Sequence, residues 1–147
     1  MILYQDTDSI CKRYLTDEEG IAETGRAVNT ADVVATSLIA YAEVKGVLSR
    51  ARRARRLRST RAFQQASDDF DADWQNYFVI AVSPELVADA GRLASEHALT
   101  GVDAIHLASA LALRARVPAT VSVSTWDRVL ARAFRAEGLS LAHEVTT

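Results

Sequence analysis

Short runs rich in β-branched residues alternate with longer helical segments, and this alternation constrains the fold more than any other feature of the sequence. Strands separated by helices favour an α/β fold, with a mainly parallel sheet of about five strands and helices on both faces. A chain of 147 residues can bury the core of one such domain, so we expect residues 1–147 to form a single domain. The expected strands are Met1–Tyr4, Val33–Thr36, Phe78–Val82, Thr120–Ser124 and Ser140–His143.

Helix-capping residues and the two prolines mark where the intervening helices begin and end. Serine is a preferred N-cap, and proline suits the first helical position. Ligands of such sheets bind in the crevice beyond the carboxyl ends of the strands, where we therefore expect the functional side chains. The expected helices are Ser9–Leu15, a helix from about Asp17–Glu19, one capped by Ser37, and then Thr60–Asn76, Ser83–His97, Gly101–Arg116 and Trp126–Glu137.

Four acids fall at this end of the predicted sheet. Asp6 directly follows the first strand and Asp127 follows the fourth, whereas Glu43 and Asp103 lie on apolar helix faces. A buried charge without a partner costs several kcal/mol or more. We expect no lysine or arginine to share these faces at the right spacing to neutralise the acids, so a bound cation is expected.

Three of the four acids also have a purely structural explanation. Asp6 and Asp127 suit helix N-caps, and Asp103 suits a first helical turn, where the helix dipole favours an acid. Glu43 has no such explanation. The four acids together therefore favour a metal site more than any one of them does.

Segments that span essentially the whole chain resemble PIN-domain nucleases, and in particular the VapC-type toxins of bacterial toxin–antitoxin pairs. The most specific one reads Asp-Ala-Ile-His-Leu-Ala-Ser-Ala-Leu, from Asp103 to Leu111. The resemblance implies a three-layer α/β/α sandwich that cleaves single-stranded or loop RNA with Mg²⁺ or Mn²⁺, and a cognate antitoxin as partner. The segments that carry the resemblance are Ile2–Tyr14, Ala35–Glu43, Leu99–Leu111 and Val123–Leu130.

By this resemblance, Asp6, Glu43, Asp103 and Asp127 are the catalytic, metal-binding acids, and Thr125 is a nearby hydroxyl. We expect Asp6 and Asp103 to bind the metal directly, with Glu43 and Asp127 holding metal-bound waters or a second ion. Carboxylate oxygens are hard ligands suited to Mg²⁺, and one ion or a close pair can activate water for phosphodiester hydrolysis.

Two residues depart from the family pattern. Gln5 lies where the strand is usually apolar, and Asp8 lies where a small hydroxyl residue is more usual. A fifth acid beside the site can alter metal occupancy or repel phosphate. Asp8 therefore keeps a second hypothesis open, in which the chain is a non-catalytic module that binds RNA or a protein partner. A third hypothesis is a haloacid-dehalogenase-type phosphatase using Asp6 and Asp8, but it leaves Glu43 unexplained.

Seven arginines lie between residues 50 and 61 without an intervening acid. They leave 10 of the 17 basic residues for the rest of the chain, which holds all 19 acids. A basic strip beside an acidic remainder suggests contact with a polyanion, and a solvated helix surface is the alternative. The predicted contacts of this block with RNA, or with an acidic antitoxin tail, are Arg50, Arg52, Arg53, Arg55 and Arg56.

The remaining features limit the function further. Cys11 is the only cysteine, and no signal peptide or membrane-spanning run is apparent, so we expect a cytoplasmic protein without internal disulfides. His97, His106 and His143 show no metal-ligand spacing, and His106 is interpreted as a packed or hydrogen-bonded residue. We also expect a homodimer, for which Leu86, Leu93 and Ala94 offer an apolar helix face.

Overall fold

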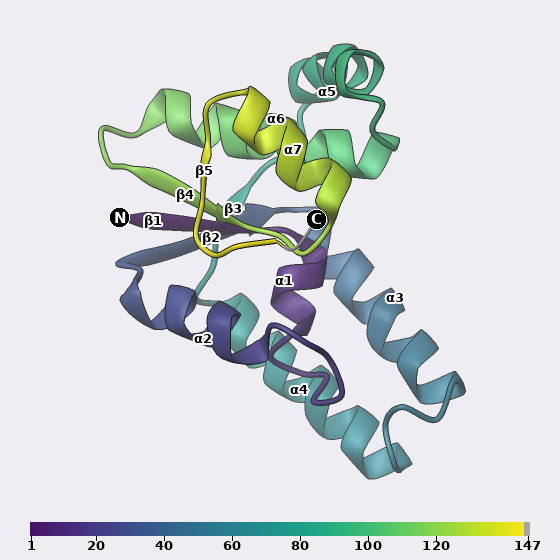
Figure 1. Cartoon of the computed structure of the whole chain (residues 1–147). Coiled ribbons are helices and arrows are strands. Elements are labelled where there is room, and N and C mark those ends of the chain that lie inside the picture. Colours follow the sequence, from purple (N-terminus) through teal and green to yellow (C-terminus); the bar gives the residue numbers. More distant parts are fainter. Residues whose placement is uncertain (146–147) are drawn as a thin grey trace.

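Five parallel strands form the centre of the computed structural model, which describes residues 1–145 (Figure 1). The strand order is β3-β2-β1-β4-β5, and every neighbouring pair is parallel. The predicted number and direction of the strands are therefore confirmed. The strands are β1 (Ile2–Gln5), β2 (Val33–Ser37), β3 (Phe78–Ile80), β4 (Val121–Ser124) and β5 (Ser140–Leu141).

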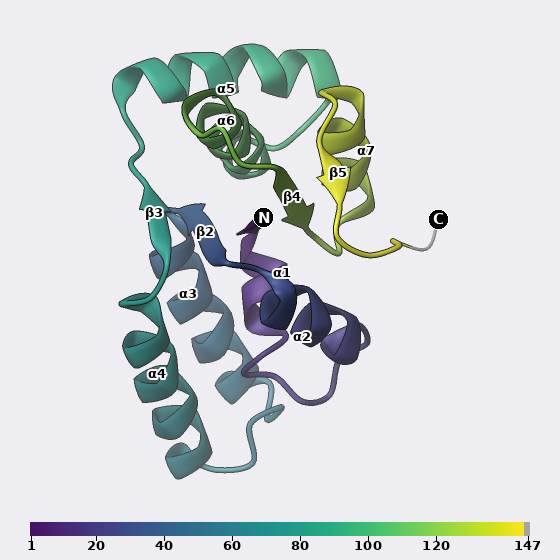
Figure 2. The same ribbon diagram turned by 90° about the vertical axis from the view of Figure 1, so that its left-hand side faces the viewer.

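Helices cover both faces of this sheet, which confirms the predicted three-layer α/β/α sandwich (Figures 1 and 2). Helices α5, α6 and α7 lie on one face, and α1 to α4 lie on the other. No single helix among the described residues is long and apolar enough to span a membrane; α5 and α6 pass that test only as a pair, with a bend of 114° between them. The helices are α1 (Thr7–Cys11), α2 (Ile21–Thr30), α3 (Ala40–Arg53), α4 (Thr60–Trp74), α5 (Pro84–His97), α6 (Gly101–Arg116) and α7 (Arg128–Ala136).

Each helical layer packs its own apolar core. Tyr4 of β1 and Phe134 of α7 belong to the core beneath α5, α6 and α7. Cys11 and Phe70 belong to the second core, formed by α1, α3 and α4. Cys11 is thus the buried small side chain that the sequence predicts, and it makes no disulfide.

Three predicted helix starts differ from the observed ones by two to four residues. Helix α1 begins at Thr7 because Asp6 caps it, and α3 begins at Ala40 because Ser37 is the last residue of β2. Helix α2 begins at Ile21 rather than near Asp17–Glu19. The side chain of Asp17 forms an ion pair with a distant arginine instead of supporting a helix N-terminus.

The apolar face predicted for a homodimer is not exposed. Leu86 is 7% exposed and Leu93 is 1% exposed, and both belong to the core of the chain itself, with Ala94 packed against it. This part of the prediction is wrong because the face of α5 that carries these residues packs on α6.

The chain changes direction across the sheet between β1 and β4. Strands β2 and β3 lie to one side of β1, whereas β4 and β5 lie to the other. Gln5 pairs in register with Ser124, so the residues that follow these two strands emerge side by side. Such a switch point is the usual ligand site of an open parallel sheet.

Gly20 packs against an aromatic residue beside this switch point. Its φ of +83° is in the left-handed region, and a Cβ built on it would lie 2.2 Å from the indole ring of Trp126. That indole donates a hydrogen bond to Thr24 (2.9 Å) and stacks on His143. Gly20 therefore allows the close packing that holds the residue preceding Asp127.

We expect Gly20→Ala to destabilise the protein by about 2 kcal/mol or more, because left-handed backbone alone costs a Cβ-bearing residue about 1–2 kcal/mol and the indole must also move. Gly91→Ala is the matched control, since its Cβ would meet no atom within 4 Å in α5. That control should stabilise by about 0.5–1 kcal/mol. Thermal unfolding followed by circular dichroism measures both; equal stability of Gly20→Ala and the wild type would contradict the packing argument.

Candidate active site

Asp6 lies at the junction of β1 and α1 and is almost fully buried, with 4% of its surface exposed. One carboxylate oxygen accepts a hydrogen bond from the backbone N–H of Ser9 (2.9 Å), which caps α1. The other accepts a hydrogen bond from the hydroxyl of Thr125, which follows β4. Thr125 is thus in direct contact with one of the predicted acids.

The environment of Asp6 disfavours its charged form. Burial raises the pKa of this carboxyl to about 7, although the neighbouring His106 and the hydrogen bond from Thr125 oppose that rise. The negative charge of Asp8 raises the pKa further. A cation bound beside Asp6 would reverse this effect by favouring the carboxylate.

Glu43 is anchored by two hydrogen-bond donors from other parts of the fold. Its Oε1 accepts a hydrogen bond from the hydroxyl of Thr7 (2.8 Å) and lies 2.8 Å from Nε2 of His106. Burial opposes ionisation, but the hydrogen bonds from His106 and Thr7 lower the pKa of Glu43 below its usual value. Glu43 is therefore a carboxylate at neutral pH.

Asp103 and Asp127 both lie at helix N-termini. Asp127 caps α7 by accepting a hydrogen bond from the backbone N–H of Leu130 (2.7 Å). Asp103 lies in the first turn of α6 and accepts one from the hydroxyl of Thr100 (2.8 Å). The structural explanations for these aspartates and for Asp6 are therefore correct. Within residues 1–145, however, the hydrogen bonds to Asp103 and to Asp127 each use only one of the two carboxylate oxygens.

All four predicted acids line one cavity of about 290 Å³. Asp8 lies exposed at its rim, where partial desolvation raises the pKa of the Asp8 carboxyl, and Lys12 opposes this rise. The charges of Asp127 and Asp103 raise that pKa as well. The cavity thus concentrates negative charge, as expected of a cation site.

Three residues of the cavity were missed or misjudged in the sequence. Thr7 and His106 both contact Glu43, and His106 is hydrogen-bonded as interpreted, but its partner was not predicted. Arg50 lies two turns beyond Glu43 on α3 and lines the same cavity. The expectation that no arginine shares the face of Glu43 is therefore wrong, and the seven-residue spacing was the signal that could have corrected it.

The arginine block does not present one continuous surface. Arg50, Arg52 and Arg53 belong to α3, whereas Arg55 follows it with a φ of +59°. Arg56 bonds Asp17 (2.9 Å) and Glu18 (2.6 Å), so its charge is neutralised within the chain. Of the five predicted contacts, Arg50 is the one that lines the cavity.

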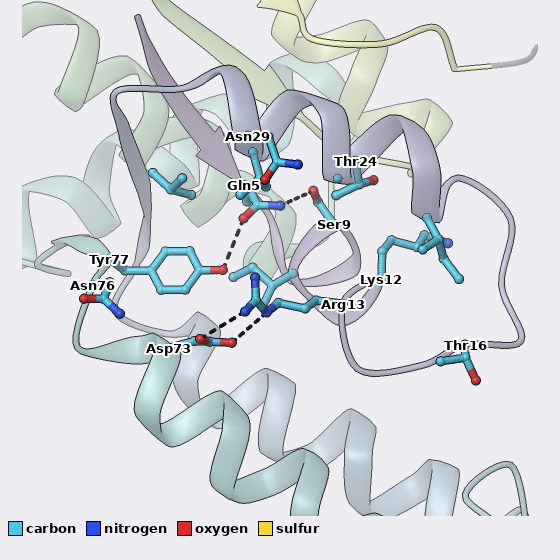
Figure 3. A pocket seen from close by; sticks show the side chains of 15 residues that line it. Gln5, Ser9, Lys12, Arg13, Thr16, Thr24, Asn29, Asp73, Asn76 and Tyr77 are labelled. Carbon is cyan, nitrogen blue, oxygen red and sulfur yellow. Dashed lines mark hydrogen bonds and ion pairs between the residues drawn. The ribbon is translucent and has the colours of Figure 1, made fainter.

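A larger cavity of about 490 Å³ lies between α1, α2 and the end of α4 (Figure 3). Gln5 forms part of the cavity wall. Its side-chain nitrogen donates a hydrogen bond to the Ser9 hydroxyl (2.8 Å), and its side-chain oxygen accepts one from the Tyr77 hydroxyl (3.2 Å). Below them, Arg13 and Asp73 form an ion pair. These partners explain why a polar residue occupies the last position of the buried strand β1.

The surface also holds a group of potential ligands that the sequence did not indicate. The ligand atoms of Glu96, His97 and Glu137 lie within 4.8 Å of one another. Each has a partner in the chain, since Arg92 binds Glu96 and His97 lies 2.7 Å from Glu137. Contacts with neighbouring side chains therefore account for this group.

Comparison with known proteins identifies relatives along nearly the whole chain. No protein-family model matches it. Ribonuclease VapC45 and ribonuclease VapC49, from two strains of Mycobacterium tuberculosis, are each 34% identical over 145 residues, which cover 96% of this chain and 94% of each relative.

Solved structures share the fold at lower identity. A toxin–antitoxin complex from Klebsiella pneumoniae contains a chain that is 19% identical, with a TM-score of 0.67 over 99% of this chain and all of that one. Mycobacterium tuberculosis VapC20, described as a sarcin–ricin loop cleaving toxin, is 18% identical, with a TM-score of 0.65 over 93% of this chain and 95% of that one. These likenesses agree with the predicted architecture. Together with the 34% identity to two VapC ribonucleases, they show that this chain belongs to the VapC ribonuclease family.

Proposed function

We propose that this protein is a Mg²⁺- or Mn²⁺-dependent endoribonuclease, the toxin of a toxin–antitoxin pair, and that it cleaves single-stranded or loop RNA. The observation that carries the proposal is the convergence of Asp6, Glu43, Asp103 and Asp127 on one cavity. The relatives named as ribonucleases support RNA as the substrate class.

The donor set suits a hard divalent cation. It consists of carboxylate oxygens, which Mg²⁺ and Mn²⁺ prefer over softer ligands. Asp6 and Asp103 would bind the ion directly, with Glu43 and Asp127 holding its waters or a second ion. When bound, the metal supplies a more acidic water and stabilises charge on the scissile phosphate.

The chain itself positions the reacting groups. Thr125 and the first turn of α1 hold Asp6 in place, while the anchored Glu43 can accept a proton from the attacking water. Arg50 lies at the cavity with an exposed guanidinium that can bind a phosphate of the RNA backbone.

A cognate antitoxin is the second part of the proposal. The structural neighbours include a toxin–antitoxin complex from Klebsiella pneumoniae and VapBC2 from Rickettsia felis bound to promoter DNA. In this chain, the exposed Arg52, Arg53 and Arg55 remain free of acidic partners among the described residues, and an acidic antitoxin segment would complement them.

The non-catalytic alternative is separated by metal binding. If Asp8 prevents a metal ion from occupying the site, titration with Mn²⁺ will show no metal binding, while the affinity for RNA stays intact. The phosphatase alternative uses Asp6 and Asp8 only, and leaves the convergence of Glu43, Asp103 and Asp127 without a role.

We expect Asp6→Asn and Glu43→Gln each to reduce RNA cleavage by about 100-fold or more, because each removes a charge from the metal site. Single-turnover cleavage of RNA by purified, partner-free protein measures this, with Mg²⁺ or Mn²⁺ and with chelator. Asp69→Asn is the control, since Asp69 is exposed on α4 and, among residues 1–145, bonds only Gln65. Cleavage by Asp6→Asn at the wild-type rate, or cleavage that survives chelator, would refute the metal site.

Metal-free stability should depend on Asp6 and on pH. The pKa of this acid is raised from 3.8 to about 7, so the folded state binds more protons than the unfolded state in that interval, and stability falls as pH rises from about 4 to about 7. Asp6→Asn should therefore be more stable than the metal-free wild type at pH 8, by on the order of a few kcal/mol in the free energy of unfolding, and should be similarly stable at pH 4. Added Mn²⁺ should raise the melting temperature of the wild type more than that of Asp6→Asn. The same pH dependence of stability in the wild type and in Asp6→Asn would contradict the raised pKa of Asp6.

Replacing Arg50 should weaken RNA binding, whereas replacing Arg56 should not. Arg50→Ala removes one phosphate contact, so the slope of log affinity against log salt should fall by about one. Arg56→Ala breaks exposed ion pairs with Asp17 and Glu18 and should cost at most about 1 kcal/mol of stability. Fluorescence anisotropy with a catalytically inactive background measures binding. Unchanged affinity and slope in Arg50→Ala would point to an antitoxin contact instead.

A further inference from the structure

A buried chain of hydrogen bonds runs from the centre of the sheet to Glu43. The hydroxyl of Tyr4 lies 2.8 Å from Nδ1 of His106, and Nε2 of the same ring lies 2.8 Å from Oε1 of Glu43. Tyr4 is fully buried and His106 is 2% exposed. These residues come from β1, α6 and α3, so the chain of contacts exists only in the folded protein.

The donors and acceptors of this chain determine one another. Glu43 is ionised and can only accept, so Nε2 of His106 must carry a hydrogen. In the tautomer whose only N–H is at Nε2, Nδ1 holds a lone pair, and the Tyr4 hydroxyl lies 2.8 Å away, where it can donate to that lone pair. Burial raises the pKa of Tyr4 well above its usual value, which keeps this hydroxyl protonated.

Glu43 needs such an anchor because it cannot use a helix end. Asp6 and Asp127 are oriented by capping α1 and α7, but Glu43 is the fourth residue of α3 and caps nothing. Both of its donors, Thr7 and His106, act on Oε1. Its Oε2 receives no hydrogen bond from the described part of the chain and remains available to the cavity.

We propose that His106 is a positioning residue that orients the Glu43 carboxylate toward the metal, and that Tyr4 selects the ring tautomer that makes this possible. The inference rests on the proposed function, in which Glu43 belongs to the metal site. His106 acts through Glu43, because a ring that is 2% exposed has almost no surface to offer RNA. Hydrogen-bond partners of metal ligands typically change metal affinity by about 10–100-fold when they are removed.

Two substitutions at position 106 separate orientation from packing. In His106→Gln, the amide nitrogen can take the place of Nε2 and still donate to Glu43. In His106→Asn, the shorter side chain cannot reach it. Both variants lose the imidazole ring and should lose similar thermal stability, but we expect Mn²⁺ affinity to fall about 10–100-fold only in His106→Asn. Isothermal titration with Mn²⁺ measures the affinity, with Glu43→Gln as the reference for loss of the carboxylate.

The tautomer is tested without metal or substrate. Long-range ¹H–¹⁵N NMR of the His106 ring in the metal-free wild type should show a protonated Nε2 and an unprotonated, hydrogen-bonded Nδ1. Tyr4→Phe keeps the packing of the ring against Phe134 but removes the donor, so it should shift the Nδ1 resonance and weaken Mn²⁺ binding several-fold. This measurement does not require that either variant at position 106 folds.

The outcomes distinguish this inference from the proposed function. If the wild type binds Mn²⁺ and Glu43→Gln does not, while His106→Asn binds like the wild type, the positioning role is overturned and the metal site remains. An equal loss of Mn²⁺ affinity in His106→Gln and His106→Asn would show a packing role and would also overturn the positioning role. A protonated Nδ1 in the wild type would overturn it as well. A wild-type protein that neither binds Mn²⁺ nor cleaves RNA would overturn both.

Discussion

The parallel pairing of β1 with β4 is the constraint on which the rest of the site depends. Because Gln5 pairs in register with Ser124, the next residues, Asp6 and Thr125, emerge together and bond to each other. A slip of one residue would point every side chain of a strand to the opposite face of the sheet. The register therefore decides both which side chains enter the core and which carboxylate enters the cavity.

The acids are kept in place by interactions that do not neutralise them. Asp6 and Asp127 bond backbone N–H groups at helix ends, and Asp103 bonds a hydroxyl, so the partial positive charge of helix N-termini stabilises them only in part. A full ion pair with arginine would stabilise the fold more and would also occupy the oxygens that a metal needs. The raised pKa of Asp6 is the energetic consequence of leaving that charge unpaired.

What the sequence predicts well is local, and what it misses depends on contacts between distant segments. The strands and the positions of Asp6 and Asp127 follow from short-range patterns, and the structure places both acids as expected. The bond between His106 and Glu43 joins residues 63 positions apart, and no periodicity within either helix indicates it. The predicted start of α2 is wrong for a related reason. An acid such as Asp17 suits a helix N-terminus, but Asp17 instead forms an ion pair with Arg56, 39 residues away.

Under the proposed function, a cavity lined by carboxylates must still accept a polyanion, and the positions of the arginines bear on how it would do so. A basic side chain bound directly to the acids would take the place of the proposed metal. Without any basic side chain nearby, the acids would repel the phosphates of RNA. Arg50 lies two helical turns from Glu43 on α3, and the hydrogen bonds of Glu43 come from Thr7 and His106, so Arg50 would be left to the proposed contact with a phosphate. Arg56, by contrast, is bound by acids of the loop before α2 and contributes to the fold. One basic run in the sequence thus divides between the cavity, which Arg50 lines, and ion pairs within the chain, which Arg56 forms.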